Sequence, residues 1–288
     1  MFKETGLNVK VFKIKRKKVT IMNSTHFFVR EIGKKTYLID DKGNATAYLV
    51  IGRTKALLID TGTGANDLLS CVKTFTKLPL MVVNTHGHSD HVWGNYQFEE
   101  AYISMADKDL YYEAYSVDER RNFIDMFKYM IPQELTSEEI ENWIHINPCE
   151  VLSINHGDRL DIGERVLEVI ELPGHTKGSI VLLDEKEKIL FSGDSIIGRL
   201  WMHLSESTSL EVYLNSMKRL RHYCNKFEKI YCGHTKYNEE GFEVKFINEI
   251  ITDVSKIIDG ELTGTYLKDK SGECLVCNFD YWSIWYKN

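Results

Sequence analysis

Residues 85–91 read Thr85-His86-Gly87-His88-Ser89-Asp90-His91 and come just after the apolar run at residues 78–83. Four side chains that commonly bind metal ions, those of His86, His88, Asp90 and His91, fall within six residues. In an extended segment His86 and His88 project to the same side, because side chains alternate along a strand. Asp90 and His91 follow where the chain leaves the strand, so they can serve a neighbouring ion. Imidazole and carboxylate ligands suit zinc, and also iron or manganese.

The composition is that of a globular protein with an acidic balance. The chain has 288 residues, of which 43% are hydrophobic and 27% charged, and its formal net charge is −6. This length can bury a substantial core, and the negative charge disfavours a nucleic-acid partner. The first residues lack the apolar core of a secretory signal, and no apolar run approaches the ~20 residues of a membrane span. We therefore expect a cytoplasmic protein with a small-molecule substrate and no membrane partner, and we leave a homodimer open.

From residue 151 onward the chain repeats one local arrangement, an apolar strand followed by a turn of small residues and a side chain of metal-ligand type. Strands at 166–170, 189–191 and 229–231 lead in turn to His175, Asp194 and His234. An earlier strand, at 56–59, ends at Asp60. Because α/β proteins assemble their pockets at strand ends, we expect these side chains to meet the His-rich stretch.

The chain shows no sign of a division into separate domains. No Pro/Ser-rich linker or low-complexity tract interrupts it, so we predict a single domain over residues 1–288 with its core at about 35–240. Residues 106–146 predict a helical insertion, in which Thr136-x-x-Glu139 is a candidate capping box. A similar pattern, Thr208-x-x-Glu211, precedes an amphipathic helix. Residues 241–288 predict a helix followed by strands.

Five landmarks, taken together, resemble the motifs of the metallo-β-lactamase superfamily. They are Asp60-x-Gly62, His86-x-His88-x-Asp90-His91, Gly174-His175-Thr176, Ser192-Gly193-Asp194 and Gly233-His234. The resemblance spans about residues 35–240 and implies an α/β (α+β) fold, a four-layer αβ/βα sandwich of two mixed sheets flanked by helices. Asp194 fills a position that true β-lactamases of this superfamily generally lack, so the chain resembles the glyoxalase II, lactonase and phosphodiesterase branches more closely.

The resemblance also implies a role for each ligand position. His86, His88 and His175 would hold one metal ion, Asp90, His91 and His234 would hold a second, and Asp194 would bridge both. Asp90 is thereby also a candidate catalytic residue. Asp60 would lie behind the ligands and hydrogen-bond an imidazole N–H, which fixes the tautomer of that ring. The implied cofactors are two divalent metal ions, with zinc as the first choice and iron or manganese as alternatives.

This ligand set implies hydrolysis. Two cations ~3.5–4 Å apart can hold a bridging hydroxide as nucleophile and polarise the scissile bond. We expect a dinuclear metal-dependent hydrolase that acts on a small ester, thioester or lactone. The alternatives are a phosphodiesterase or nuclease-type hydrolase, a mononuclear iron oxidoreductase similar to the persulfide dioxygenases, and a non-catalytic binding protein on the same fold.

Residues 198–203 follow the bridging position and are candidates for contact with the substrate. The guanidinium of Arg199 would suit a carboxylate or phosphate, and Trp201 lies two residues further on. His203 could serve as an acid or base, with a place in an ordinary surface loop as the alternative.

Overall fold

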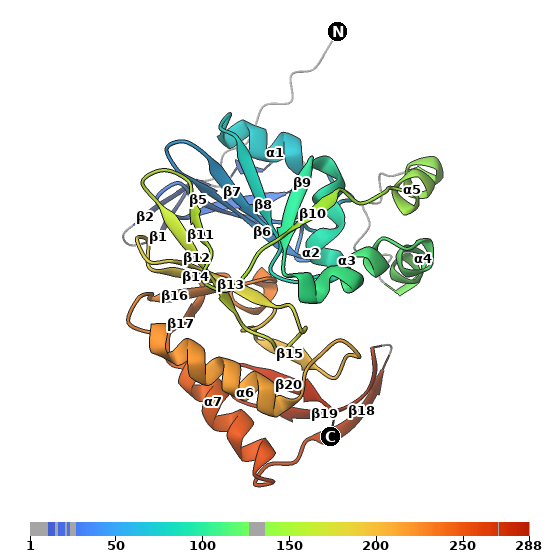
Figure 1. The fold of residues 1–288 in the computed structure, drawn as a ribbon, viewed down its shortest axis with the longest axis vertical. Helices are drawn as coiled ribbons and strands as arrows, with labels where there is room; N and C mark the ends of the chain where they lie inside the picture. Colours follow the sequence, from blue (N-terminus) through green and yellow to red (C-terminus); the bar gives the residue numbers. More distant parts are fainter. Residues whose placement is uncertain are drawn as a thin grey trace.

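Two large β-sheets form the centre of the molecule (Figure 1). The structure is a computed structural model that describes residues 11–14, 17–20, 22–23, 27–126, 136–269 and 271–287. The larger sheet has eight strands in the order β10-β9-β8-β7-β6-β5-β4-β3. In this order the strands are Glu150–Ser153, Glu100–Ile103, Leu80–Val83, Ala56–Ile59, Thr46–Ile51, Thr36–Asp40, Phe28–Gly33 and Met22–Asn23. Strands β7 to β10 pair in parallel and the others antiparallel, so the sheet is mixed.

The second sheet has six strands and is also mixed. Its order is β11-β12-β13-β14-β16-β17, and β14 and β16 are the one parallel pair. The strands are Arg159–Asp161, Val166–Glu171, Ile180–Asp184, Ile189–Gly193, Lys229–Cys232 and Phe242–Glu243. A separate antiparallel pair near the amino terminus consists of β1, Val11–Ile14, and β2, Lys17–Thr20.

Apolar side chains from both sheets meet in one core between them. Tyr48 of β6 packs against Phe191 of β14, with ring centroids 5.0 Å apart, and Leu57 and Leu182 belong to the same cluster. Every residue of β6, β7, β13 and β14 is buried, as expected for strands that are covered on both faces. Since burying a Leu or Phe side chain contributes roughly 1.5–3 kcal/mol, this core holds the two sheets together and with them the loops at their edges.

Helices cover the outer faces of the two sheets. Helix α1 buries Leu68, Cys71 and Val72 against the larger sheet, and α6 and α7 lie side by side against the smaller one (Figure 1). The α-helices are α1 Leu68–Phe75, α2 Ser89–Val92, α3 Lys108–Ala114, α4 Val117–Met126, α5 Ser137–Ile144, α6 Leu210–Leu220 and α7 Lys245–Ile258. This arrangement confirms the predicted four-layer αβ/βα fold. Among the described residues, no helix has the length and apolar character that crossing a bilayer requires.

A four-stranded sheet lies next to α6 and α7. Its order is β15-β20-β19-β18, and the strands are Arg199–Met202, Ser283–Tyr286, Gly272–Asn278 and Thr265–Asp269. The sequence predicted strands at the carboxyl end, but it did not predict that residues 199–202 would join them. Strand β15 pairs in parallel with β20, more than 80 residues later in the chain, and no local pattern reveals such a long-range pairing.

The predicted insertion contains α3, α4 and α5. These helices form a core of their own with Trp93, in which Tyr111, Phe123 and Trp143 are buried. Thr136 and Glu139 form the predicted capping box at the start of α5. The cap of α6 is Ser209 rather than the predicted Thr208, because the helix begins one residue later than the pattern suggested. Residues 127–135 of the insertion lie outside the described residues, and the single-domain assignment stays a prediction.

Candidate metal centre and active-site pocket

The predicted ligands that come from loops follow strands of both sheets. His86 comes after β8, His175 after β12, Asp194 after β14 and His234 after β16. Asp90 and His91 lie on the short helix α2, which follows the same loop. Gly233 is needed beside His234, because a Cβ at this position would collide with the Asp194 carboxylate and the His91 ring.

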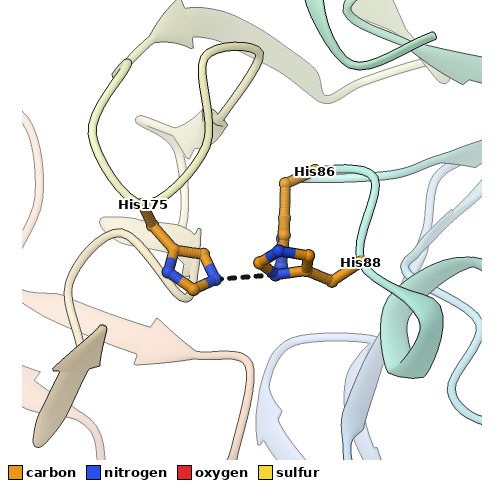
Figure 2. Close-up of side chains that lie close together, drawn as sticks. All are labelled: His86, His88 and His175. Atoms are coloured by element: carbon orange, nitrogen blue, oxygen red, sulfur yellow. Dashed lines mark hydrogen bonds between the residues drawn. The ribbon is translucent and has the colours of Figure 1, made fainter. Parts of the chain in front are cut away.

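The structure brings all of the predicted ligands together. Their nitrogen and oxygen atoms form three overlapping groups, each within 4.8 Å: His86, His88 and His175; His86, His91 and Asp194; and Asp90, His91 and His234. In the first group, His175 Nε2 lies 2.9 Å from His88 Nδ1, and Figure 2 shows the three imidazoles converging from two separate loops.

Asp194 lies between the two predicted ion positions. Its Oδ2 atom is 3.2 Å from His234 Nε2 and 3.9 Å from His175 Nε2, while its Oδ1 atom is 3.5 Å from His91 Nε2. The Oδ2 atom of Asp90 is 3.4 Å from His234 Nε2 and 3.8 Å from His91 Nε2. One carboxylate thus faces both groups of histidines, as a bridging ligand must.

Each imidazole is held from behind by a partner on its other nitrogen. His175 Nδ1 donates to the carbonyl oxygen of Trp201 at 2.7 Å, and His234 Nδ1 donates to that of Asn44 at 2.5 Å. Because a carbonyl can only accept, Nδ1 carries a proton in both rings, and in the neutral ring the Nε2 lone pair points into the cluster. His88 is oriented the other way round: its Nε2 lies 2.6 Å from Glu206 Oε1, and its Nδ1 faces the cluster.

Asp60 sets the tautomer of two histidines. Its Oδ2 atom accepts hydrogen bonds from the Thr85 hydroxyl at 2.8 Å and from His91 Nδ1 at 2.9 Å. Its Oδ1 atom accepts a hydrogen bond from the Thr85 backbone N–H at 2.7 Å. The only hydroxyl proton of Thr85 is therefore used, so His86 Nδ1, 3.0 Å from Thr85 Oγ1, must donate to that oxygen. When the rings are neutral, as metal binding requires, His86 and His91 consequently both direct an Nε2 lone pair inwards. Asp60 has a φ of +59°, a strained backbone conformation that this network holds in place.

The donor set fits metal ions. His86 Nε2, His91 Nε2 and Asp194 Oδ1 are buried and have no hydrogen-bond partner among the described residues. The lone pairs of His88 Nδ1 and His175 Nε2 face each other at 2.9 Å, an arrangement that repels unless a cation or a proton lies between them. Buried polar atoms without partners are costly, and a shared cation removes that cost.

The charged groups around the cluster also favour the binding of cations. Burial lowers the pKa of His91, but Asp90, Asp194 and Asp60 outweigh it and raise this pKa to about 10. Burial also lowers the pKa of His175, and the neighbouring His88 helps to bring it to about 4. Burial would raise the pKa of Asp194, yet His234 and His91 hold it well below its usual range. The carboxylates thus attract positive charge to the place where the lone pairs converge.

A comparison with protein families decides the classification. Residues 40–234 match the family model of the metallo-β-lactamase superfamily. The chain belongs to this superfamily. It is a hydrolase of the superfamily, and the motifs that suggested the resemblance are the loops that build the cluster.

Relatives within the superfamily include thioester hydrolases. The acyl-coenzyme A thioesterase MBLAC2 of Gallus gallus is 30% identical over 213 residues, which cover 67% of this chain and 74% of that protein. A hydroxyacylglutathione hydrolase of Rippkaea orientalis is 26% identical over 172 residues, covering 58% of this chain and 54% of that protein. A metallo-β-lactamase structure from Pontibacter korlensis superposes with a TM-score of 0.52 at 19% identity, covering 86% of this chain and 99% of that one.

A cavity of about 310 Å³ opens onto the metal-ligand cluster of this superfamily member. Asp194 and His234 border it, and so do the predicted substrate contacts Arg199 and Trp201. Phe123 of the insertion helix α4 also borders the cavity, so the insertion contributes to the pocket as well as to its own core.

Several pocket residues were not found from the sequence. Lys236 and Tyr237 line the cavity, and their position two and three residues after His234 could have suggested them. Glu206 also lines it and contacts His88, yet no motif marks this residue. Burial alone raises the pKa of Glu206, but the hydrogen bond and the charge of His88 lower it to about 2. The carboxylate therefore stays charged beside its histidine.

His203 does not border the cavity. It is 1% exposed, its Nε2 lies 3.0 Å from the Ser271 hydroxyl oxygen, and its ring packs against Trp201 and Trp285. It is thus neither in a surface loop nor in the described wall of the pocket, and its role as an acid or base stays a prediction.

Proposed function

We propose that this superfamily member is a dinuclear metal-dependent hydrolase that cleaves a small acyl substrate, an ester, thioester or lactone, with a thioester as the first choice. The observation that carries the proposal is the position of Asp194, whose two oxygens face different groups of histidines. A carboxylate shared in this way stabilises two neighbouring cations against their mutual repulsion. His86, His88 and His175 would hold one ion, and Asp90, His91 and His234 the other.

The chain positions both its donors and the substrate. Two bound divalent cations would lower the pKa of water towards neutrality and polarise the scissile carbonyl. Asp60, Glu206 and the backbone carbonyls behind the histidines keep the ring lone pairs directed inwards. In thioester hydrolysis the oxygen of water bonds to the acyl carbon, the carbon–sulfur bond breaks, and the two protons of water end on the carboxylic acid and the thiol. No serine or cysteine nucleophile is then required.

Two observations support a thioester. Both relatives named above, an acyl-coenzyme A thioesterase and a hydroxyacylglutathione hydrolase, carry names that denote thioester cleavage. Arg199 and Lys236 also line the pocket that the ligands border, and their cationic groups suit the anionic groups that biological thiols carry.

A substrate panel tests the proposal. The protein reconstituted with zinc should hydrolyse acyl thioesters, lose this activity on chelation and regain it when zinc is added back. The Asp194→Ala variant is the control that detects any thioester hydrolysis independent of the ligand cluster. Hydrolysis of bis-p-nitrophenyl phosphate without any acyl hydrolysis would replace the proposal with a phosphodiesterase. Oxygen uptake with a persulfide, and no hydrolysis, would replace it with a mononuclear oxidoreductase. If the protein reacted with none of these compounds, a non-catalytic binding role would replace the proposal.

Three further expectations stay predictions: that zinc is the native metal, that the protein works in the cytoplasm, and that it can form a homodimer. Metal analysis, localisation and solution mass each address one of them.

A further inference from the structure

Asp107 is a buried carboxylate at the start of the insertion, and none of the roles described above uses it. It ends the short helical turn Met105–Asp107 and comes directly before α3. Its residue is 2% exposed, and no Lys, Arg or His side chain in the described part of the chain forms an ion pair with it. A buried charge without a counter-ion is costly unless hydrogen bonds compensate it.

Three hydrogen bonds compensate the charge of Asp107. Its Oδ2 atom accepts from the Gly87 backbone N–H at 2.9 Å and from the Thr176 hydroxyl at 2.6 Å. Its Oδ1 atom accepts from the Gly178 backbone N–H at 2.7 Å. Bonds to an ionised acceptor are the strong ones, so the carboxylate joins the segment of Gly87 firmly to the segment of Thr176 and Gly178. We refer to these three bonds as the Asp107 network.

The two segments that the Asp107 network joins carry one of the ligand groups. Gly87 lies between His86 and His88, and Thr176 directly follows His175. Figure 2 shows these three histidines approaching each other from two separate loops. The distance between the loops therefore decides whether the three imidazoles can share one ion.

Two glycines let the carboxylate come this close to both loops. A Cβ at Gly178 would lie 2.6 Å from Asp107 Oδ1, and a Cβ at Gly87 would lie 3.1 Å from the Asp107 carbonyl oxygen and 3.2 Å from Leu110. Neither glycine has a positive φ. Close packing against the start of the insertion, rather than backbone strain, thus accounts for a residue without a side chain at these two positions.

A separate backbone hydrogen bond joins the same two segments at their base. The Ile180 N–H donates to the Thr85 carbonyl oxygen at 2.8 Å. This bond does not involve Asp107, so the strands should stay in place without the carboxylate. The parts of the loops that carry the histidines depend on the Asp107 network in addition.

We propose that Asp107 is a positioning residue for one metal ion, because it holds the loop of His86 and His88 at the correct distance from the loop of His175. This inference rests on the proposed metal-dependent function, since it requires the three histidines to share an ion. We call this ion the first ion, and the ion of the other ligand group the second ion. Asp60 supports one ring of each group, whereas the Asp107 network acts on the first ion alone.

The Asp107→Asn variant tests the network, because a carboxamide has one acceptor oxygen and one donor nitrogen. If the NH₂ group takes the place of Oδ1, it faces the Gly178 N–H. If it takes the place of Oδ2, it faces the Gly87 N–H. In either orientation a backbone N–H meets another donor, so one of the two loops is released.

Two single-ion backgrounds separate the effects on the two ions. His234→Ala removes a ligand of the second ion, and His175→Ala removes a ligand of the first. Asp107→Asn should lower zinc affinity about tenfold or more in the His234→Ala background, and by less than about threefold in the His175→Ala background. Competition with a chromogenic chelator measures both affinities, and thermal unfolding shows whether the fold is retained. Equal losses in both backgrounds would reveal general structural damage and overturn the proposal.

Thr176→Val is a second variant that removes one donor and nearly keeps the volume of a fully buried side chain. It should weaken binding of the first ion about three- to tenfold, and it tests the proposal even if Asp107→Asn does not fold. Asp41→Asn is the control, because Asp41 is also buried but accepts its hydrogen bonds from Thr63 and Asn66. It should leave both affinities unchanged.

The outcomes separate this inference from the proposed function. Unchanged affinity for the first ion in both Asp107→Asn and Thr176→Val would overturn the positioning role and leave the proposed function intact. No substrate enters these measurements. If the expected pattern of affinities held in a protein that hydrolysed no thioester, ester or lactone, the proposed function would fail and the positioning role of Asp107 would stand.

Discussion

Replacing Asp60 by asparagine should damage the metal centre while leaving the shape of its support almost unchanged. Asp60 is 2% exposed and accepts three hydrogen bonds, two of them on Oδ2. In the Asp60→Asn variant, the amide oxygen can keep the bond from the Thr85 backbone N–H. The NH₂ group then takes the place of Oδ2 and faces the Thr85 hydroxyl and His91 Nδ1, both of which donate in the wild type.

The two rings that depend on Asp60 must then change their tautomers. To accept from the amide, His91 has to move its proton to Nε2, where the lone pair for the metal ion is needed. The Thr85 hydroxyl, no longer bound to a carboxylate, can turn its proton towards His86 Nδ1, 3.0 Å away, which has the same effect on His86. A hydrogen bond to a charged group is worth roughly 1.5–3 kcal/mol, or about ten- to a hundredfold in affinity. Because His86 and His91 serve different ions, both ions should bind about 10–100-fold more weakly.

Competition with a chromogenic chelator would measure these affinities, and thermal unfolding would show that the fold is retained. Asp41→Asn is a matched control, because Asp41 is also buried and accepts from Thr63 and Asn66 but contacts no ligand. Wild-type affinity for both ions in Asp60→Asn would refute the tautomer argument. An equal loss in Asp41→Asn would show that removing any buried carboxylate is enough.

Two further predictions concern the surroundings of the ligands. Glu206→Gln should retain the hydrogen bond from His88 but lose the negative charge, whereas Glu206→Ala loses both. The alanine variant should therefore bind metal about tenfold or more weakly, and the glutamine variant should be weakened less. Equal metal affinities in both variants and the wild type, measured by the same competition, would contradict a supporting role for Glu206. Metal binding at pH 7 should release protons, because the pKa of His91 is about 10 and that of His234 is raised, so affinity should increase with pH. Calorimetry in two buffers of different ionisation enthalpy measures this release, and identical heats in both would contradict it.

The ligands could be predicted from the sequence because each follows a strand that the sequence also reveals. A buried strand leaves a recognisable apolar run, and the turn after it carries the functional side chain, as with Asp194 after β14 and His234 after β16. The position of Asp60 at a strand end made it a candidate support for the same reason. Parallel neighbours in a sheet then bring these ends to one edge.

The parts that could not be predicted depend on long-range contacts. Glu206 lies 118 residues from His88 in the sequence, within an irregular segment, so nothing local indicates their hydrogen bond. Strand β15 was not predicted, because its pairing partner, β20, is at the other end of the chain. The burial of His203 follows from that same pairing, which packs it against Trp285.

Metal stoichiometry tests the central claim, that Asp194 is shared by two ions, most directly. Protein purified without chelator should contain close to two equivalents of metal, measured by elemental mass spectrometry. The Asp194→Asn variant, nearly isosteric but neutral, should unfold at a similar temperature and lose chiefly the ion held by Asp90, His91 and His234. One equivalent in the wild type, or two tightly held ions in Asp194→Asn, would contradict the dinuclear assignment.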